Sequence, residues 1–253
     1  MIDEFIAVRV ANTVSPRRQT GDGSAHMISG LDDSFLSRNR IIAMNITLIG
    51  AGNMGAGFVK QLTAAGHQVR VTARDLAKAQ ALAAAHPGAT AVAPAEALGD
   101  SQVVIVATGY ADAVPALQAL GSLEGRVVVD ITNPLTADFM GLTLGYETSA
   151  AEEIAKALPG AQVVKAFNTV LAQVLAEGPA FANGQTVPVF YAGDDERAKQ
   201  TVRALAESIG FQPVDAGGLK NARYLEPVAG LNIYFAYGAG QGTQIAPTWI
   251  HRG

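Results

Sequence analysis

"NITLIGAGNMGAGFVKQL", residues 45–62, predicts a strand that ends in a glycine turn and runs directly into a helix. The apolar run 45–50 is typical of a strand buried on both faces of a parallel sheet. Gly50, Gly52 and Gly55 match the pattern G-x-G-x-x-G of dinucleotide-binding turns. In that pattern the first glycine permits the tight turn and the second lets the backbone approach a pyrophosphate. The third lets the helix pack closely on the strand.

The position of this pattern makes it informative, because a chain with 27 glycines produces bare matches by chance. Here the pattern follows a predicted strand and opens a helix, whose free N–H groups would face an anion. The alternative is a glycine turn that packs without a ligand. We expect the whole turn to contact a dinucleotide, through Gly50, Ala51, Gly52, Asn53, Met54 and Gly55.

Composition argues against several kinds of function. The net charge is −4 and no long basic run occurs, so nucleic acid is not an expected partner. The chain has no cysteine, which removes disulfides, thiolate metal sites and a cysteine nucleophile. Its four histidines lie far apart, and we expect no metal site. No apolar run approaches the roughly 20 residues of a membrane helix, so the sequence predicts a cytoplasmic protein without a membrane partner.

Two parts of the chain differ in pattern. Residues 1–43 are polar and lack a sustained period, which predicts a flexible N-terminal tail. From residue 44 onward β-branched strand segments alternate with helical segments. The predicted strands are 45–50, 67–74, 102–108, 126–132, 161–167, 187–193 and 211–217. This alternation predicts an α/β fold with a doubly wound parallel sheet, a Rossmann fold with a small C-terminal α/β extension. We expect an NADP-binding domain at 44–168 and a smaller lobe for the substrate or second coenzyme at 169–253, in which 217–253 is the hardest part to assign.

The end of the second strand decides which dinucleotide is bound. An NAD site usually has an acidic side chain there for the ribose hydroxyls. This chain instead has Thr72 and Arg74, with Lys78 one helical turn later. A guanidinium and an ammonium suit a 2′-phosphate, which favours NADP(H). Asp75 is expected either as the N-cap of the next helix or as a ribose ligand.

Small and polar residues follow three further strands at the edge where ligands bind in such sheets. Ala107 and Thr108 could pass under a nicotinamide ribose. Asn133 and Asn168 end two apolar strands in amides suited to hydrogen bonding, although Asn is also an ordinary turn residue. We expect all four to contribute to the cofactor site, and no residue is singled out as certainly catalytic.

Three motifs together resemble the NADP oxidoreductases that depend on a deazaflavin coenzyme: "ITLIGAGNMG" (46–55), "VVKAFNT" (163–169) and "GFQPVDAGGLKNARYLEPVA" (210–229). Similar sequences include the reductase domains of six-transmembrane metalloreductases. The resemblance implies NADPH at the glycine turn, with its 2′-phosphate at Arg74 and Lys78. It also implies that Asn168 and the C-terminal segment shape the pocket of a deazaflavin. Ala73 replaces the usual serine, and Asn168 stands where archaeal members carry histidine.

The resemblance implies reversible hydride transfer between NADP(H) and a flat redox coenzyme, a small-molecule substrate. Asn168 is then a candidate for positioning. The alternatives are an NADPH reductase of a flavin, a metal chelate or an imine, and a non-catalytic NADP(H) sensor. His67 is expected in a surface turn rather than as a base. The aromatic cluster at 233–237 predicts either a pocket wall or a core or homodimer contact.

Overall fold

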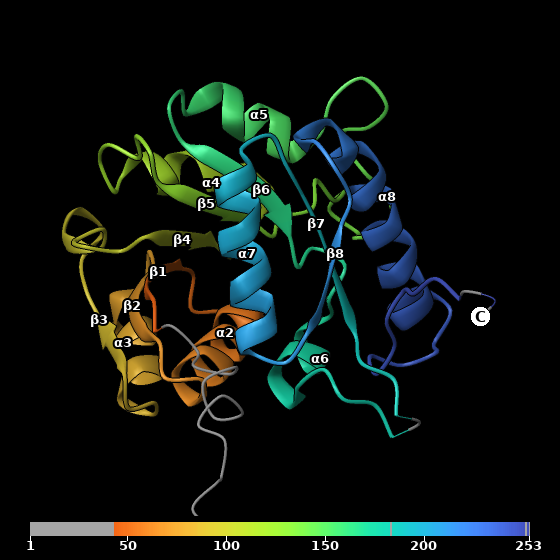
Figure 1. Cartoon of the computed structure of the whole chain (residues 1–253), viewed down its shortest axis with the longest axis horizontal. Helices are drawn as coiled ribbons and strands as arrows, with labels where there is room; N and C mark the ends of the chain where they lie inside the picture. The colour runs from red at the N-terminus through yellow and green to blue at the C-terminus, as the bar shows by residue number, and fades with distance from the viewer. Residues whose placement is uncertain (1–42, 183, 251, 253) are drawn as a thin grey trace, which may run out of the picture. The chain divides into compact units, whose positions relative to one another are not determined.

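The computed structural model describes residues 43–182, 184–250 and 252, which belong to one compact unit of the chain. The predicted N-terminal tail lies, apart from residue 43, outside the described residues. Eight strands form a single sheet in the order β3-β2-β1-β4-β5-β6-β7-β8 (Figure 1). The strands are β1 (Asn45–Ile49), β2 (Gln68–Thr72), β3 (Ala89–Ala91), β4 (Val103–Val106), β5 (Val127–Asp130), β6 (Gln162–Ala166), β7 (Pro188–Gly193) and β8 (Gln212–Asp215).

The first six strands are all parallel, as predicted, and have the order of a Rossmann fold. The sheet departs from the predicted parallel arrangement only at β7, which runs antiparallel to β6, while β8 is parallel to β7. The connection between β6 and β7 contains only the short helix α6 (Ala172–Glu177). Because α6 packs against the end of α2 (Asn53–Ala64), the chain enters β7 from the edge where β6 ended.

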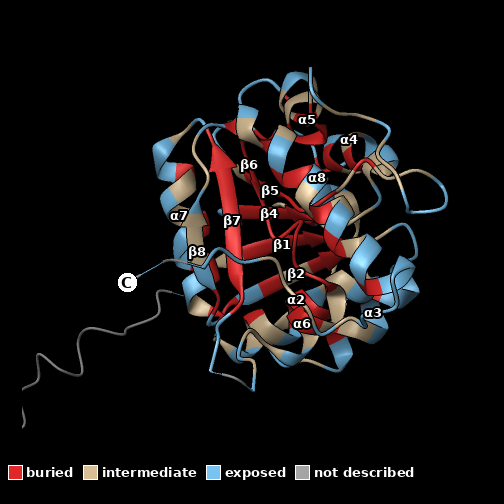
Figure 2. Ribbon diagram, turned by 90° about the vertical axis from the view of Figure 1, so that its right-hand side faces the viewer, coloured by how far each residue is buried: buried red, intermediate tan, exposed pale blue. Residues whose placement is uncertain are grey.

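Alternating side chains of the strands give the sheet two apolar cores, one on each face. Ile46 and Leu48 of β1 pack on one face, while the next residue, Ile49, packs on the other. The first face is covered by α2, α3 (Leu76–Ala84), α6 and α7 (Glu196–Ser208), and the second by α4 (Tyr110–Gln118) and α5 (Ala150–Ala157). Figure 2 shows the buried strands between these two layers. This is the doubly wound arrangement that the sequence predicts.

The C-terminal segment, which the sequence left unassigned, forms a short 3-10 turn η2 (Leu219–Asn221), the helix α8 (Ala222–Ile233) and a π turn η3 (Tyr234–Gly238). The buried residues of α8 recur at helical spacing: Ala222, Leu225, Glu226, Ala229 and Asn232. Apolar periodicity alone does not predict this helix, because Pro227 lies inside it and its buried side includes the polar residues Glu226 and Asn232. Helix α8 contacts α5 and so joins the second face of the sheet.

Candidate functional site

Two of the three glycines in the turn after β1 are required by the packing of the chain itself. Gly50 has a φ of 120°, and a Cβ there would lie 2.4 Å from the carbonyl oxygen of Ala107. A Cβ on Gly55 would lie 2.1 Å from the carbonyl oxygen of Gly50. Both distances are far below any van der Waals contact, so no side chain fits at either position. These glycines bring β1, β4 and the start of α2 together.

Gly52 differs: apart from its chain neighbours, no atom of the described residues lies within 4 Å of the position that its Cβ would occupy. Packing therefore does not account for a glycine here. Gly52 is also the N-cap of α2, and no side chain accepts a hydrogen bond from the first turn of that helix. An open space in front of uncapped N–H groups fits the pyrophosphate of a dinucleotide, since the helix start also carries partial positive charge.

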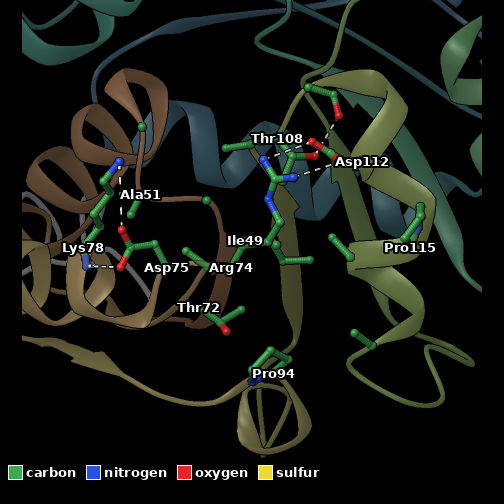
Figure 3. A pocket seen from close by; sticks show the side chains of 17 residues that line it. Ile49, Ala51, Thr72, Arg74, Asp75, Lys78, Pro94, Thr108, Asp112 and Pro115 are labelled. Atoms are coloured by element: carbon green, nitrogen blue, oxygen red, sulfur yellow. Dashed lines mark hydrogen bonds and ion pairs between the residues drawn. The ribbon is translucent and has the colours of Figure 1, made fainter.

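A first cavity of about 460 Å³ opens beside this turn, between the ends of β1, β2 and β4 (Figure 3). It brings together eight of the residues predicted from sequence: Gly50, Ala51, Gly52, Thr72, Arg74, Lys78, Ala107 and Thr108. Its far wall is the first part of α4, including Asp112 and Pro115. The adenosine half of a dinucleotide has the size and the apolar character to fit such a cleft.

Charged side chains ring the mouth of the first cavity. The Arg74 guanidinium reaches across it to α4, with Nη2 3.3 Å from Oδ2 of Asp112 and Nη1 donating to Oδ1 at 3.4 Å (Figure 3). The Arg74 side chain is 87% exposed. Asp75 is the N-cap of α3, accepting from the backbone N–H of Lys78 at 3.3 Å, so the N-cap interpretation is confirmed. Asp112 was not predicted from the sequence, because it lies on helix α4 and not at the end of a strand.

A second cavity of about 600 Å³ lies on the other side of the same turn. Asn53 and Met54 line it, directly after the glycines that line the first cavity. Asn133 and Asn168 lie on its wall at the ends of β5 and β6. Its other walls come from α8, the π turn η3 and the loop after β5, with these members: Asp138, Phe139, Met140, Ala229, Asn232, Ile233 and Tyr237. Of the thirteen predicted contacts, only Gly55 lines neither cavity.

Side-chain amides lock the wall of the second cavity. Nδ2 of Asn168 donates to Oδ1 of Asn133 and to the carbonyl oxygen of Leu225, both at 3.0 Å. Nδ2 of Asn133 donates back to the carbonyl oxygen of Asn168 at 3.0 Å. These bonds tie the ends of β5 and β6 to α8. Asn168 is therefore a buried cross-link whose Nδ2 donates both of its hydrogens within the protein.

The residue before this lock has an unusual backbone. Phe167 has a φ of 58°, in the left-handed region that bulky side chains rarely adopt. Its buried ring packs edge-on against Phe58 and Phe211, with centroids 5.1 and 5.9 Å apart. The two aromatic contacts hold the strained turn in place. Strain of this kind, of the order of 1–3 kcal/mol, concentrates at functional sites.

A buried charge cluster supports the same wall from behind. Nζ of Lys165 lies 2.6 Å from Oδ2 of Asp130 and 2.8 Å from Oε1 of Glu226, and all three side chains are inaccessible or nearly so. Glu226 also accepts hydrogen bonds from the backbone N–H groups of Ala150 and Ala151, at the start of α5. Burial raises the pKa of Glu226, and the nearby Lys165 charge opposes that shift. The cluster fastens α8 to β5, β6 and α5.

The prediction for His67 is wrong. The side chain is fully buried, with Nδ1 accepting from the backbone N–H of Met44 at 3.0 Å and Nε2 2.8 Å from Oγ of Ser208. Burial lowers the pKa of His67. It joins the start of β1 to the end of α7 and lines neither cavity. His67 does follow the turn after α2, as predicted. Its side chain is buried because α7 packs over it, which the local sequence does not show.

Comparison with known proteins identifies relatives of the whole folded part. Residues 45–134 match the family model "NADP oxidoreductase coenzyme F420-dependent". The F420-dependent NADP reductase of Methanothermobacter marburgensis is 30% identical over 212 residues, which cover 75% of this chain and 91% of that protein. The metalloreductase STEAP3 of Rattus norvegicus is 31% identical over 188 residues, 74% of this chain but only 36% of that longer protein.

Solved structures agree with this assignment. A crystal structure from Arthrobacter sp. FB24, described as a candidate F420-dependent NADP reductase, superposes with a TM-score of 0.74 at 29% identity. The match covers 83% of this chain and all of that one. Among the residues that the structure describes, no helix has the length and hydropathy needed to cross a membrane.

Proposed function

This chain belongs to the family of NADP oxidoreductases that depend on coenzyme F420, a deazaflavin, and we propose that it transfers hydride between NADPH and a deazaflavin ring. The observation that carries the proposal is the pair of cavities on either side of one glycine turn. A dinucleotide with its pyrophosphate over Gly52 would extend its adenosine into the first cavity and its nicotinamide toward the second. The second cavity then has room for the ring that exchanges hydride.

The residues around the first cavity would hold the cofactor. The uncapped N–H groups after Gly52 would bind the pyrophosphate, and Arg74 with Lys78 would bind the 2′-phosphate. Arg74 would have to leave Asp112 to do so. Ala107 and Thr108 line the first cavity, where their small side chains would permit close approach of the dinucleotide.

Bound NADPH supplies a hydride from its nicotinamide ring, and the oxidised deazaflavin that gains it takes one proton from water, leaving NADP⁺ and reduced deazaflavin. The chain's own task is orientation and exclusion of water. Asn133, Asn168 and the charge cluster around Lys165 fix the wall against which the rings would align. Apolar residues such as Met54, Ile131 and Ile233 would shield them. Alignment alone accounts for a large share of the rate in such reactions.

NADPH oxidation by the purified protein tests this proposal against its alternatives. The acceptors are a deazaflavin, riboflavin, a ferric chelate and a cyclic imine, and each is followed at its own absorbance. We expect deazaflavin to give the highest kcat/KM. Tight NADPH binding without turnover of any acceptor would favour the sensor instead, and preferential turnover of one of the others would replace deazaflavin by that acceptor.

The glycine turn provides the matching variant. Gly52→Val should abolish most NADPH binding while the sheet still forms, because its side chain would fill the open space in front of α2. Gly145→Val is the control: a Cβ at Gly145 also meets no atom within 4 Å, but Gly145 lines neither cavity. Unchanged NADPH affinity in a folded Gly52→Val protein would remove the pyrophosphate from this turn.

Three sequence predictions stay predictions. The division of the chain at residue 168 falls between β6 and α6, although β7 and β8 continue the same sheet. Limited proteolysis with and without NADPH tests whether the two parts behave as separate lobes. A cytoplasmic location and a homodimer are tested by fractionation of the host cell and by light scattering of the purified protein.

A further inference from the structure

A hairpin formed by residues 135–142 projects over the second cavity, and we call it the aromatic hairpin after Phe139 at its tip. A β-bridge between Leu135 and Leu142 closes its base. Within it, the backbone N–H of Thr136 donates to Gly141 O at 2.9 Å, and the N–H of Gly141 donates back to Oγ1 of Thr136 at 2.9 Å. The N–H of Phe139 donates to Thr136 O at 2.9 Å. The hairpin therefore presents its tip in a defined conformation.

Phe139 is an unexpected residue for this tip. Its φ is 62°, the left-handed region in which glycine or asparagine is favoured, and its side chain is 61% exposed. The backbone is therefore strained, and little burial of the ring compensates for that strain. The ring nevertheless lines the second cavity, together with the neighbouring Met140. A strained backbone that holds an exposed ring at a cavity mouth indicates a functional role for the ring.

A second exposed aromatic ring lines the same cavity. Tyr237 lies in the π turn η3, lines the same cavity and is 56% exposed. The aromatic hairpin lies beside this part of the chain, since a Cβ on Gly230 of α8 would come within 3.7 Å of Leu142. A Cβ on Gly238 of the π turn would come within 3.2 Å of Sδ of Met140. Short π turns of this kind occur frequently at functional sites. The two rings thus come from separate elements that are held in register around one cavity.

We propose that Phe139 and Tyr237 select the hydride acceptor by stacking on a planar conjugated ring that enters the second cavity. The inference rests on the proposed function and deepens it, because it assigns acceptor specificity to two residues outside the dinucleotide site. Offset or edge-on aromatic contacts favour flat ring systems over aliphatic substrates of the same volume. Both residues would bind the acceptor ring and take no part in the transfer of the hydride or the proton.

Binding of two probes, 5-deazariboflavin and riboflavin, tests this proposal without any need for turnover. Their fluorescence anisotropy is measured in the presence of saturating NADP⁺, with wild type and with Phe139→Gly, Phe139→Trp and Tyr237→Leu. Phe139→Gly and Tyr237→Leu should each weaken ring binding about 3- to 10-fold, the range typical of a lost aromatic contact. Phe139→Trp should bind the ring as wild type does. NADPH affinity should stay unchanged in all three.

The chain offers a matched control for the glycine variant. Tyr146 also has a left-handed backbone, with a φ of 54°, and is 96% exposed, but it lines neither cavity. Tyr146→Gly and Phe139→Gly both remove an exposed ring and relieve the same backbone strain. Both should therefore keep or raise the melting temperature, but only Phe139→Gly should lose ring affinity.

The outcomes separate this inference from the proposed function. Equal ring affinity in wild type and Phe139→Gly would overturn the inference, as would an equal loss in Tyr146→Gly or the absence of ring binding in wild type. Hydride transfer to deazaflavin with a KM insensitive to Phe139 would also overturn it and leave the proposed function standing. Ring binding that depends on Phe139 without any turnover would support the inference and contradict the proposed reaction.

Discussion

The ion pair between Arg74 and Asp112 gives a quantitative prediction about cofactor choice. The Arg74 guanidinium bonds Asp112 across the mouth of the first cavity. If Arg74 binds the 2′-phosphate, Asp112 competes with NADPH for it and has no such effect on NADH. Asp112→Asn should therefore strengthen NADPH binding, and Arg74→Ala should weaken it, with NADH nearly unchanged in both.

The exposure of the pair sets the magnitudes. Exposed ion pairs contribute about 0–1 kcal/mol, so release of Arg74 from Asp112 should strengthen NADPH binding by at most about fivefold. Hydrogen bonds to charged groups contribute about 1.5–3 kcal/mol. Because the Arg74 side chain is 87% exposed, we expect the lower end of that range, which is about a tenfold loss for Arg74→Ala.

Fluorescence titration of the four proteins in the double-mutant cycle with NADPH and NADH, at low and high salt, measures these effects. In the Arg74→Ala background most of the gain from Asp112→Asn should vanish, because the competing partner is gone. Glu207→Gln is the control, since it breaks the exposed pair with Arg203 on α7, away from both cavities. Equal weakening of NADPH and NADH by Arg74→Ala would refute this account, and weaker NADPH binding in Asp112→Asn would make Asp112 a ligand rather than a competitor.

Two further predictions concern the wall of the second cavity. Asn168→Leu removes the donor of one buried and one partly buried hydrogen bond, so it should cost on the order of 2 kcal/mol of stability and slow hydride transfer far more than it weakens NADPH binding. An unchanged rate would exclude Asn168 from alignment. The pKa of Glu226 is raised by burial, so the stability that it contributes is present below its ordinary value of 4.5 and is lost as pH rises through the raised pKa. The unfolding free energy of wild type relative to Glu226→Gln should fall across that window in denaturant titrations, and a constant difference would contradict the shift.

Much of the fold follows from local sequence because the signals are local. The G-x-G-x-x-G turn is set by the backbone itself, as the distances from Gly50 and Gly55 to their neighbours show. The local sequence does not determine the direction of β7, because the same apolar strand fits the sheet in either orientation. The packing of α6 against α2 determines it. Helix α8 was missed because its buried side carries Glu226 and Asn232, whose partners lie on distant strands and loops.

The candidate site divides along the same line. Parallel strands end at one edge of the sheet, and twelve of the thirteen residues predicted from the sequence line one of the two cavities there. Their contacts with a cofactor stay predictions. Asp112 and Phe139 were missed, since one lies on a helix and the other on a hairpin, and only the folded chain brings them to the cavities. The charges of Lys165 and Asp130 within apolar strands were visible in the sequence, but the pairing of Lys165 with Glu226 depends on the position of α8.

The central claim is direct hydride transfer between NADPH and a deazaflavin, and an isotope experiment tests it most directly. NADPH with both hydrogens on nicotinamide C4 replaced by deuterium is mixed with oxidised deazaflavin and the protein. The masses of the products are then measured by mass spectrometry. The ring carbon that accepts hydride does not exchange hydrogen with water, so the label is retained. We predict one deuterium in each reduced deazaflavin for each NADPH consumed. Unlabelled reduced deazaflavin, or no reduction while NADPH remains tightly bound, would contradict the account.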